Sequence, residues 1–423
     1  MSERTRKRRD FIQNITIALL CVSAVLLFAQ TQIYSLGVSG GLLSFLSENE
    51  LPTSSANTGQ SATSLTAPVR VAAASNFGRY GSVTLTTDDD SFEPLRGLLE
   101  QALSSAQDYT ASSESLFFQA LGHTSIYYDF LVPLPLSVLG ELVRTTGDES
   151  LTARRLILAE QDGGVMLYLW DGADSYYSCA TALTPDILEQ AVSQYELGNA
   201  FFAFESEDPN AQAVDPYSLF LGTEPELPEL SVSTALSDTN QLLLALDFNP
   251  NTQFRYADAS GAEVVREGGR TLRIHPDGTL SYQGGSSQAL EVPSAEETPT
   301  LLEAVTAANT LLHKLLSSAE GTALFVSEVS QTGSEIVLRF DYQVGGIPVF
   351  FSDGESAAEI TIADGCISSM TCRIRQYTAD GSTSLLLPLR QALAIAVQRE
   401  GDELFIGYVD SGSSTVSARW LAE

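Results

Sequence analysis

The chain has 423 residues, of which 44% are hydrophobic, and a formal net charge of −31 at pH 7. Such a surface repels nucleic acid and anionic lipid headgroups, which argues against either as a partner of the folded part. The hydrophobic content is sufficient for packed cores, and the length predicts two or three folded units.

Residues 1–10 form a basic tip, and the twenty-five residues from Phe11 to Ser35 carry no charged side chain. Because about 20 apolar residues span a bilayer, we expect one transmembrane helix at 11–35. Lys and Arg stay on the cytoplasmic side, so the prediction is a single-pass protein of the cell membrane with a cytoplasmic N-terminus and extracytoplasmic C-terminal domains. A cleaved signal peptide is the alternative, but residues 29–34 offer no clear small-x-small cleavage site.

Small or weakly polar side chains recur along the predicted membrane helix at Asn14, Ala18, Cys21 and Ala24. In lipid, helices associate through side chains that permit close approach or hydrogen bonding. We therefore predict that these four residues contact a partner helix, with a plain anchor as the alternative. Residues 36–68 are predicted to be a tether, since 47–68 is rich in Ser, Thr and Ala and poor in large apolar side chains.

An N-terminal α+β domain is predicted at 69–222. Leucines at helical spacing indicate helices at 91–106 and 185–195. Two apolar arms joined by Gln161-Asp-Gly-Gly164 predict a β-hairpin over 155–169. A Pro- and Glu-rich passage at 223–230 follows.

Two more units are expected after that passage. The middle unit, 231–292, combines a short helix at 235–248 with hairpins over 254–283. The C-terminal domain, 298–423, is predicted to contain helices at 300–318 and 385–397 and strands at 322–329, 334–343, 356–363 and 366–377, before a last strand pair that ends at Trp420. The predicted fold class is α+β: a single N-terminal transmembrane helix followed by a multi-unit extracytoplasmic region of antiparallel sheets packed with helices.

Residues typical of catalysis are scattered. The three histidines, His123, His275 and His313, lie in different segments, and the sequence has no G-x-S-x-G elbow, no H-E-x-x-H and no C-x-x-C motif. Cys366 and Cys372 are six residues apart in one predicted strand, which separates them by about 20 Å and excludes a disulfide between them unless the chain turns there. We expect buried thiols, no catalytic residue, no cofactor and no metal site.

Several phrases resemble the YycH/YycI group of membrane-anchored regulators of low-GC Gram-positive bacteria. In the first unit they are Pro68-Val-Arg-Val71, Gly78-Arg-Tyr-Gly81, Leu99–Ala106, Ile126-Tyr-Tyr-Asp-Phe130 and Pro133-Leu-Pro-Leu136. The middle unit adds Gln241–Pro250 and Arg270–Tyr282. The C-terminal part, with Gly346-Ile-Pro-Val349, Ile362–Ile367 and Trp420, is similar to YycI-type and PepSY-like modules.

The resemblance implies a non-enzymatic accessory protein. Such a protein binds the sensor histidine kinase of a cell-wall-related two-component system through its membrane helix and its outer domains, and modulates signalling. A sister YycH/YycI-type protein is a second expected partner. The alternative is a PepSY-type inhibitor or accessory protein of an envelope peptidase or hydrolase. The sign of the regulatory effect does not follow from the sequence.

Overall fold

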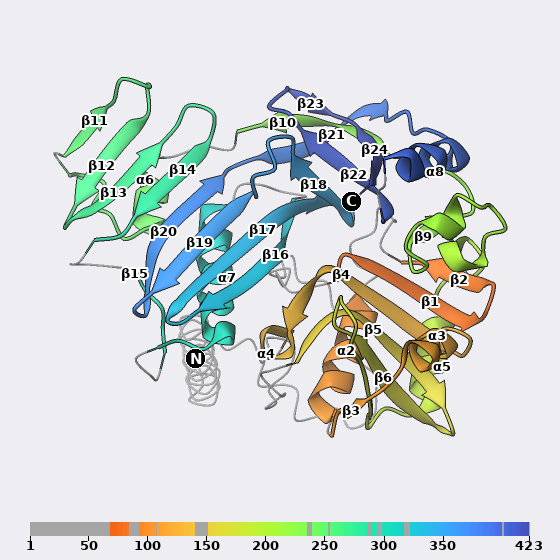
Figure 1. Cartoon of the computed structure of the whole chain (residues 1–423). Helices are drawn as coiled ribbons and strands as arrows, with labels where there is room; N and C mark the ends of the chain where they lie inside the picture. Colours follow the sequence, from red (N-terminus) through yellow and green to blue (C-terminus); the bar gives the residue numbers. More distant parts are fainter. Residues whose placement is uncertain are drawn as a thin grey trace, which may run out of the picture. The chain divides into compact units, whose positions relative to one another are not determined.

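Strands account for most of the secondary structure in the computed structural model of this chain (Figure 1). The structure describes residues 68–83, 93–106, 108–139, 151–234, 239–252, 254–285, 290–294, 298–316, 322–399 and 402–422. Within these ranges it contains twenty-four strands and seven α-helices. All of them belong to one compact unit that spans residues 61–423.

The first sheet, sheet A, has nine strands in the order β3-β7-β6-β5-β4-β1-β2-β8-β9, and every neighbouring pair is antiparallel. Its strands are β1 (Arg70–Asn76), β2 (Arg79–Ser82), β3 (Thr110–Ala111), β4 (Ser125–Pro135), β5 (Thr152–Gln161), β6 (Gly164–Trp170), β7 (Tyr176–Ala180), β8 (Ala200–Phe202) and β9 (Leu219–Leu221). The predicted hairpin is confirmed as β5 and β6. Asp162 and Gly163 have φ of 52° and 79°, the left-handed conformation that a two-residue type I′ turn requires.

The helices are α2 (Glu93–Ser105), α3 (Glu114–Ala120), α4 (Leu136–Leu139), α5 (Pro185–Val192), α6 (Thr239–Ala245), α7 (Leu301–Leu315) and α8 (Leu389–Gln398), with short 3-10 helices η2 (Ala203–Glu205) and η3 (Ala211–Ala213). Side chains alternate across sheet A, as a strand requires. Leu156 and Leu158 of β5 share one core with α2 and α5, whereas Ile157 packs in a second core with Phe117 of α3. Sheet A is therefore covered on both faces.

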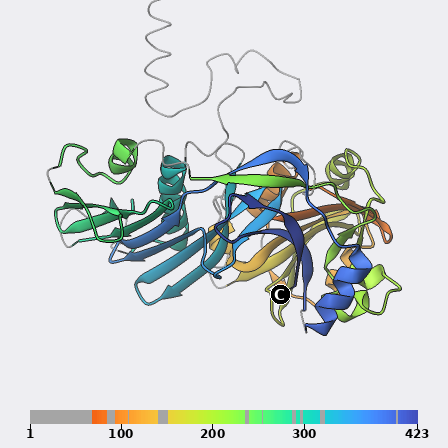
Figure 2. The ribbon, with the colours of Figure 1, turned by 90° about the horizontal axis from the view of Figure 1, so that it is seen from above.

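The largest sheet, sheet C, has twelve strands. They are β11 (Arg255–Ala257), β12 (Glu263–Glu267), β13 (Arg270–Ile274), β14 (Thr279–Gln283), β15 (Leu290–Glu291), β16 (Ala323–Thr332), β17 (Glu335–Val344), β18 (Ile347–Phe351), β19 (Ala358–Ala363), β20 (Cys366–Arg373), β22 (Leu404–Asp410) and β24 (Ala418–Ala422). Helix α7 lies on one face of the sheet (Figures 1 and 2) and buries Ala304, Leu311 and Leu312 in its core. A capping box between Thr300 and Glu303 begins that helix.

A third, three-stranded sheet, sheet B, connects distant parts of the sequence. Its strands are β10 (Pro228–Ser233), β21 (Gln376–Thr383) and β23 (Thr415–Val416). β10 lies between the other two and is antiparallel to both. The Tyr408 hydroxyl of β22 also donates to the Pro228 carbonyl at 2.9 Å, so the passage after β9 is held by the C-terminal strands.

The predicted fold class was wrong. The part of the chain that the structure describes is sheet-rich, and none of its helices is both long and apolar enough to cross a membrane. The predicted transmembrane helix at 11–35 lies outside the described residues. The sheets are also not purely antiparallel, because β18 runs parallel to β22. Hairpin patterns report only antiparallel neighbours, whereas a parallel pair depends on a long connection, here the one that contains α8.

Most elements predicted in the folded part are confirmed with shifted ends. The helix expected at 91–106 is α2, and the one expected at 300–318 is α7. The His-Pro-Asp-Gly turn joins β13 to β14, and Asp364-Gly365 joins β19 to β20. Sheet C combines strands of the predicted middle unit with strands of the C-terminal unit through the pairing of β14 with β20. The proposed domain limits stay predictions.

Candidate functional site

Three arginines and three carboxylates meet in one buried cluster, which we call the charged cluster. It consists of Arg70, Asp129, Arg154, Arg155, Asp215 and Glu403. Four of them come from adjacent strands of sheet A, namely β1, β4 and β5, while Glu403 immediately precedes β22 of sheet C. The cluster therefore connects the first strand of the described chain with the start of β22.

Asp129 is the central carboxylate and is fully buried. Its Oδ2 lies 3.1 Å from Arg70 Nη2 and 3.3 Å from Arg155 Nε. Its Oδ1 accepts the backbone N–H of Leu131 at 2.8 Å, and the Tyr127 hydroxyl donates to Oδ2 at 3.3 Å. A buried carboxylate needs such partners, because an unpaired one would cost several kcal/mol.

Arg155 holds the second carboxylate. Its Nη1 and Nη2 donate to the two oxygens of Asp215 at 3.1 and 2.7 Å, a two-pronged geometry that only a guanidinium provides. The Arg155 guanidinium carbon lies 4.6 Å from the ring centroid of Trp170 and 5.4 Å from that of Tyr217. These rings pack against the guanidinium and add cation–π attraction.

Glu403 completes the cluster. Arg70 Nη2 donates to its Oε1 at 2.5 Å, Arg154 Nη2 donates to its Oε2, and Arg155 Nη2 lies 3.5 Å from Oε1. Its side chain is only 7% exposed. A single carboxylate from the C-terminal region thus neutralises arginines of β1 and β5.

Two carboxylates of the cluster, Asp129 and Glu403, have lowered pKa values. Burial alone would raise the pKa of Asp129, but Arg70, Arg155 and Arg154 together hold that pKa well below its usual range. Burial opposes ionisation of Glu403 too, and Arg70 still brings the pKa of Glu403 below its ordinary value. Both carboxylates are ionised at neutral pH and guanidinium groups keep their protons. Asp129 and Glu403 therefore carry no proton to donate at neutral pH.

The backbone beside Asp129 is strained. β4 bulges between Asp129 and Leu134, and Leu131 within the bulge has φ of 67°, a conformation that a leucine rarely adopts. The Leu131 N–H bond to Asp129 holds this conformation. Bulges and strained residues concentrate beside binding sites, and Leu131 indeed lines a pocket.

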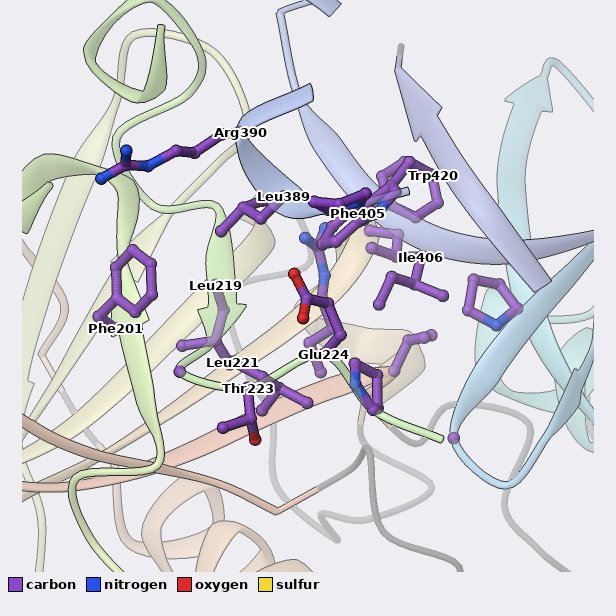
Figure 3. Close-up of a pocket in the computed structure, with 18 residues that line it drawn as sticks. Phe201, Leu219, Leu221, Thr223, Glu224, Leu389, Arg390, Phe405, Ile406 and Trp420 are labelled. Carbon is purple, nitrogen blue, oxygen red and sulfur yellow. The ribbon is translucent and has the colours of Figure 1, made fainter. Parts of the chain in front are cut away.

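That pocket, which we call the edge pocket, has a volume of about 320 Å³. Its walls are mainly apolar and include Phe201, Leu219, Leu221, Leu389, Phe405, Ile406 and Trp420. Figure 3 shows β9 residues Leu219 and Leu221 on one side and Phe405, Ile406 and Trp420 on the other. The charged residues that line it are Arg70, Glu224 and Arg390.

Arg70 belongs to both the charged cluster and the edge pocket. Its Nη2 makes the contacts with Asp129 and Glu403, and its guanidinium carbon lies 5.4 Å from the Phe405 ring centroid. Among the described residues, its Nε and Nη1 are buried without a hydrogen-bond partner. Such unpaired donors cost about 1–3 kcal/mol each, which makes Arg70 the strained point of the site.

The residues predicted to contact a partner helix, Asn14, Ala18, Cys21 and Ala24, lie outside the described residues. The three histidines are separated, as expected, on the turn after α3, the β13–β14 turn and α7. Cys179 and Cys372 are free and buried, and burial raises the pKa of each thiol to about 12. Cys366 is also free, but it is half-buried instead of buried. Within the described ranges, no group of His, Cys, Asp and Glu side chains could hold a metal ion.

Sequence reasoning missed the charged cluster. One signal was available, since Arg154 and Arg155 stand side by side in an apolar strand of a chain with only 22 basic residues. Comparison with known proteins adds no candidate: no family model, no curated protein and no solved structure matches this chain.

Proposed function

We propose that this chain is a non-enzymatic regulatory protein of the bacterial cell envelope. In this proposal its folded part binds a sensor histidine kinase of a cell-wall-related two-component system and modulates the kinase's signalling. The resemblance to the YycH/YycI group supplies the class of partner. The observation that carries the proposal is the apolar edge pocket with exposed leucines beside it.

The segment that leads into α8 presents these leucines. Leu385 is 96% exposed and Leu387 is 46% exposed, although both are large and apolar. Pro388, Leu389 and Arg390, which follow directly, line the edge pocket. Contiguous exposed apolar surface on a soluble domain usually marks a protein contact, so this segment and the pocket form the expected docking face.

The charged cluster supports a binding role over a catalytic one. Asp129 and Glu403 are ionised and paired with arginines, so neither can act as a general acid at neutral pH. The buried thiols of Cys179 and Cys372 are equally unsuited to nucleophilic attack, because the thiolate is the reactive form.

Site-specific photo-crosslinking tests the proposal in cells that make the full-length protein. A photoreactive residue at position 385 should form an adduct with one sensor histidine kinase. The matched control carries the same residue at Gln101, which is exposed on α2. An adduct with an envelope peptidase, or no adduct at position 385 beyond that at position 101, would refute the proposal; the peptidase adduct would support the alternative function.

The consequence for signalling can be measured separately. Leu385→Asp and Leu387→Asp place a charge on the docking face without removing a buried group. We expect transcription of the kinase's target genes to change relative to wild type, and to stay unchanged for Gln101→Asp. Unchanged transcription in all three variants would contradict a regulatory role for this face.

A further inference from the structure

The edge pocket lies where two sheets end. β9 is the terminal strand of sheet A, and β24 is a terminal strand of sheet C. Leu219 and Leu221 of β9 and Trp420 of β24 all line the pocket (Figure 3). Terminal strands carry unpaired backbone groups, which are a template for another strand.

Hydrogen bonds show which backbone groups of β9 are free. Ala203 N–H donates to the Ser218 carbonyl at 2.9 Å, and Gly222 N–H donates to the Asn199 carbonyl at 2.8 Å. Positions 218 and 222 therefore face β8. Because bonding alternates along an antiparallel strand, the N–H and C=O groups of Leu219 and Leu221 point away from β8.

The opposite wall is held rigidly and is continuous with the exposed leucines. The Trp420 indole N–H donates to the Leu387 carbonyl at 2.8 Å, and Ala418 N–H donates to the Ser384 hydroxyl at 2.9 Å. The segment that carries Leu385 and Leu387 is thereby fixed to β24. Apolar side chains of an added strand would meet this wall and the β9 leucines.

The charged residues that line the edge pocket indicate which charge a bound segment should carry. Acidic residues outnumber basic ones 53 to 22 in this chain, yet two of the three charged residues that line the pocket are arginines. Arg70 is only 8% exposed and is already paired with Asp129 and Glu403. Arg390 has a side chain that is 90% exposed, and its Nε lies 4.0 Å from Asp208 Oδ2. An occupant with a carboxylate would complement Arg390.

We propose that the edge pocket binds an extended segment of the partner protein, which adds as a strand to the free edge of β9. The segment carries large apolar side chains at alternate positions and one carboxylate that faces Arg390. This inference rests on the proposed function, because it assigns the docking site for the protein partner. Strand addition of this kind takes its affinity from backbone bonds and its specificity from side-chain pockets.

A capped peptide serves as the probe, with the sequence Leu-Thr-Leu-Glu-Leu-Thr-Leu, an N-terminal fluorophore and a C-terminal amide. Fluorescence anisotropy with the full-length protein should show saturable binding. Leu221→Pro removes the outward N–H of β9 without removing a β8–β9 bond, and proline is tolerated on such an edge. We expect it to weaken binding by about fivefold to tenfold, the effect of one backbone hydrogen bond, and more than Leu221→Ala, which keeps the N–H.

Circular dichroism and urea unfolding establish that Leu221→Pro is folded. A second measurement uses only the wild-type protein and two peptides N-methylated on alternate residues, so that each peptide lacks the donors of one edge. One of the two should bind at least about tenfold more weakly than the other. Equal affinity of both methylated peptides and the unmodified peptide would overturn strand addition, as would the absence of any binding.

The charge assignment has its own test. Replacing Glu by Gln in the peptide should weaken binding to the wild-type protein severalfold, and Arg390→Gln should abolish the difference between the two peptides. Equal affinity of both peptides for the wild type would overturn the carboxylate. The proposed function and the proposed strand addition can fail independently. The absence of a crosslink at position 385 refutes the kinase as partner even if the peptide binds. A kinase crosslink that persists with unchanged yield in Leu221→Pro refutes only the addition of a strand to β9.

Discussion

Two groups of arginine and carboxylate side chains in this molecule have similar geometry and opposite surroundings. In the charged cluster, the side chains of Arg155 and Asp129 are 1% and 0% exposed. On sheet C, Arg339 lies between Glu328 and Glu359 at 2.5 and 2.7 Å, and all three side chains are 42–43% exposed. The shortest contacts of the two groups are alike, since Arg70–Glu403 and Arg155–Asp215 also measure 2.5 and 2.7 Å, so burial determines what each contact contributes.

The two groups differ in what their charges contact when the partner is absent, which is water at the surface and apolar protein in the interior. When an exposed ion pair forms, each charge loses contacts with water and gains contacts with its partner, so the net stabilisation is only about 0–1 kcal/mol. Buried charges have already lost their water, so removing one partner leaves an uncompensated charge. The exposed group lies across the already paired strands β16, β17 and β19 and should add little to them. The buried cluster connects the start of β22 with sheet A, so we expect it to contribute more.

The largest effect is expected from Arg155→Met. It leaves Asp129 and Asp215 without their shared guanidinium, and breaking a buried pair in this way costs about 3–5 kcal/mol. Urea unfolding of the full-length protein measures the free energy of unfolding. Arg155→Lys is the matched variant, which keeps the charge but loses the two-pronged contact with Asp215. If Arg155→Met lowers the free energy of unfolding by less than about 1 kcal/mol, the charged cluster contributes no more to stability than the exposed group.

A smaller effect, with a pH signature, is expected from Glu403→Gln. At neutral pH the variant should lose about 1.5–3 kcal/mol, the contribution of a hydrogen bond to a charged group. The pKa of Glu403 is lowered by folding from an ordinary value of 4.5, so its contribution is complete above that pH and disappears as the pH falls through the folded pKa. The stability difference between wild type and variant should therefore shrink on acidification, and a difference that grows instead would contradict the lowered pKa.

The smallest effect is expected from Arg339→Met. Its free energy of unfolding should stay within about 1 kcal/mol of the wild type, and the difference should decrease further in high salt, because exposed pairs are screened. Urea unfolding at low and high ionic strength measures both. A loss as large as that of Arg155→Met would show that burial is not what separates the two groups.

Local features of the fold could be predicted from the sequence. The Asp-Gly turns at 162–163 and 364–365 and the amphipathic spacing of α2 and α7 are each encoded within a few residues. The parallel pairing of β18 with β22 could not be predicted, since it depends on residues more than fifty positions apart. Periodicity describes a strand's faces and not its partners. The fold-class prediction failed because the described part of the chain is richer in strand than expected and contains no helix that could cross a membrane.

The candidate site was hidden for a related reason. Arg70 and Glu403 are 333 positions apart, and nothing in either neighbourhood identifies the other. Arg154 and Arg155 were visible as charges within an apolar strand, which should have indicated buried partners. The edge pocket was not predictable, because it forms only when the ends of two sheets come together.

The position of Glu403 in the sequence has a consequence for how the protein is made. Synthesis proceeds from the N-terminus at about 5–20 residues per second, so Glu403 follows Arg70 by on the order of 20–60 seconds. Throughout that interval Arg70 and Arg154 lack the carboxylate that pairs with both of them. The end of β1 that carries Arg70 is therefore without this partner until translation is nearly finished, and a chain that stops before Glu403 lacks it permanently.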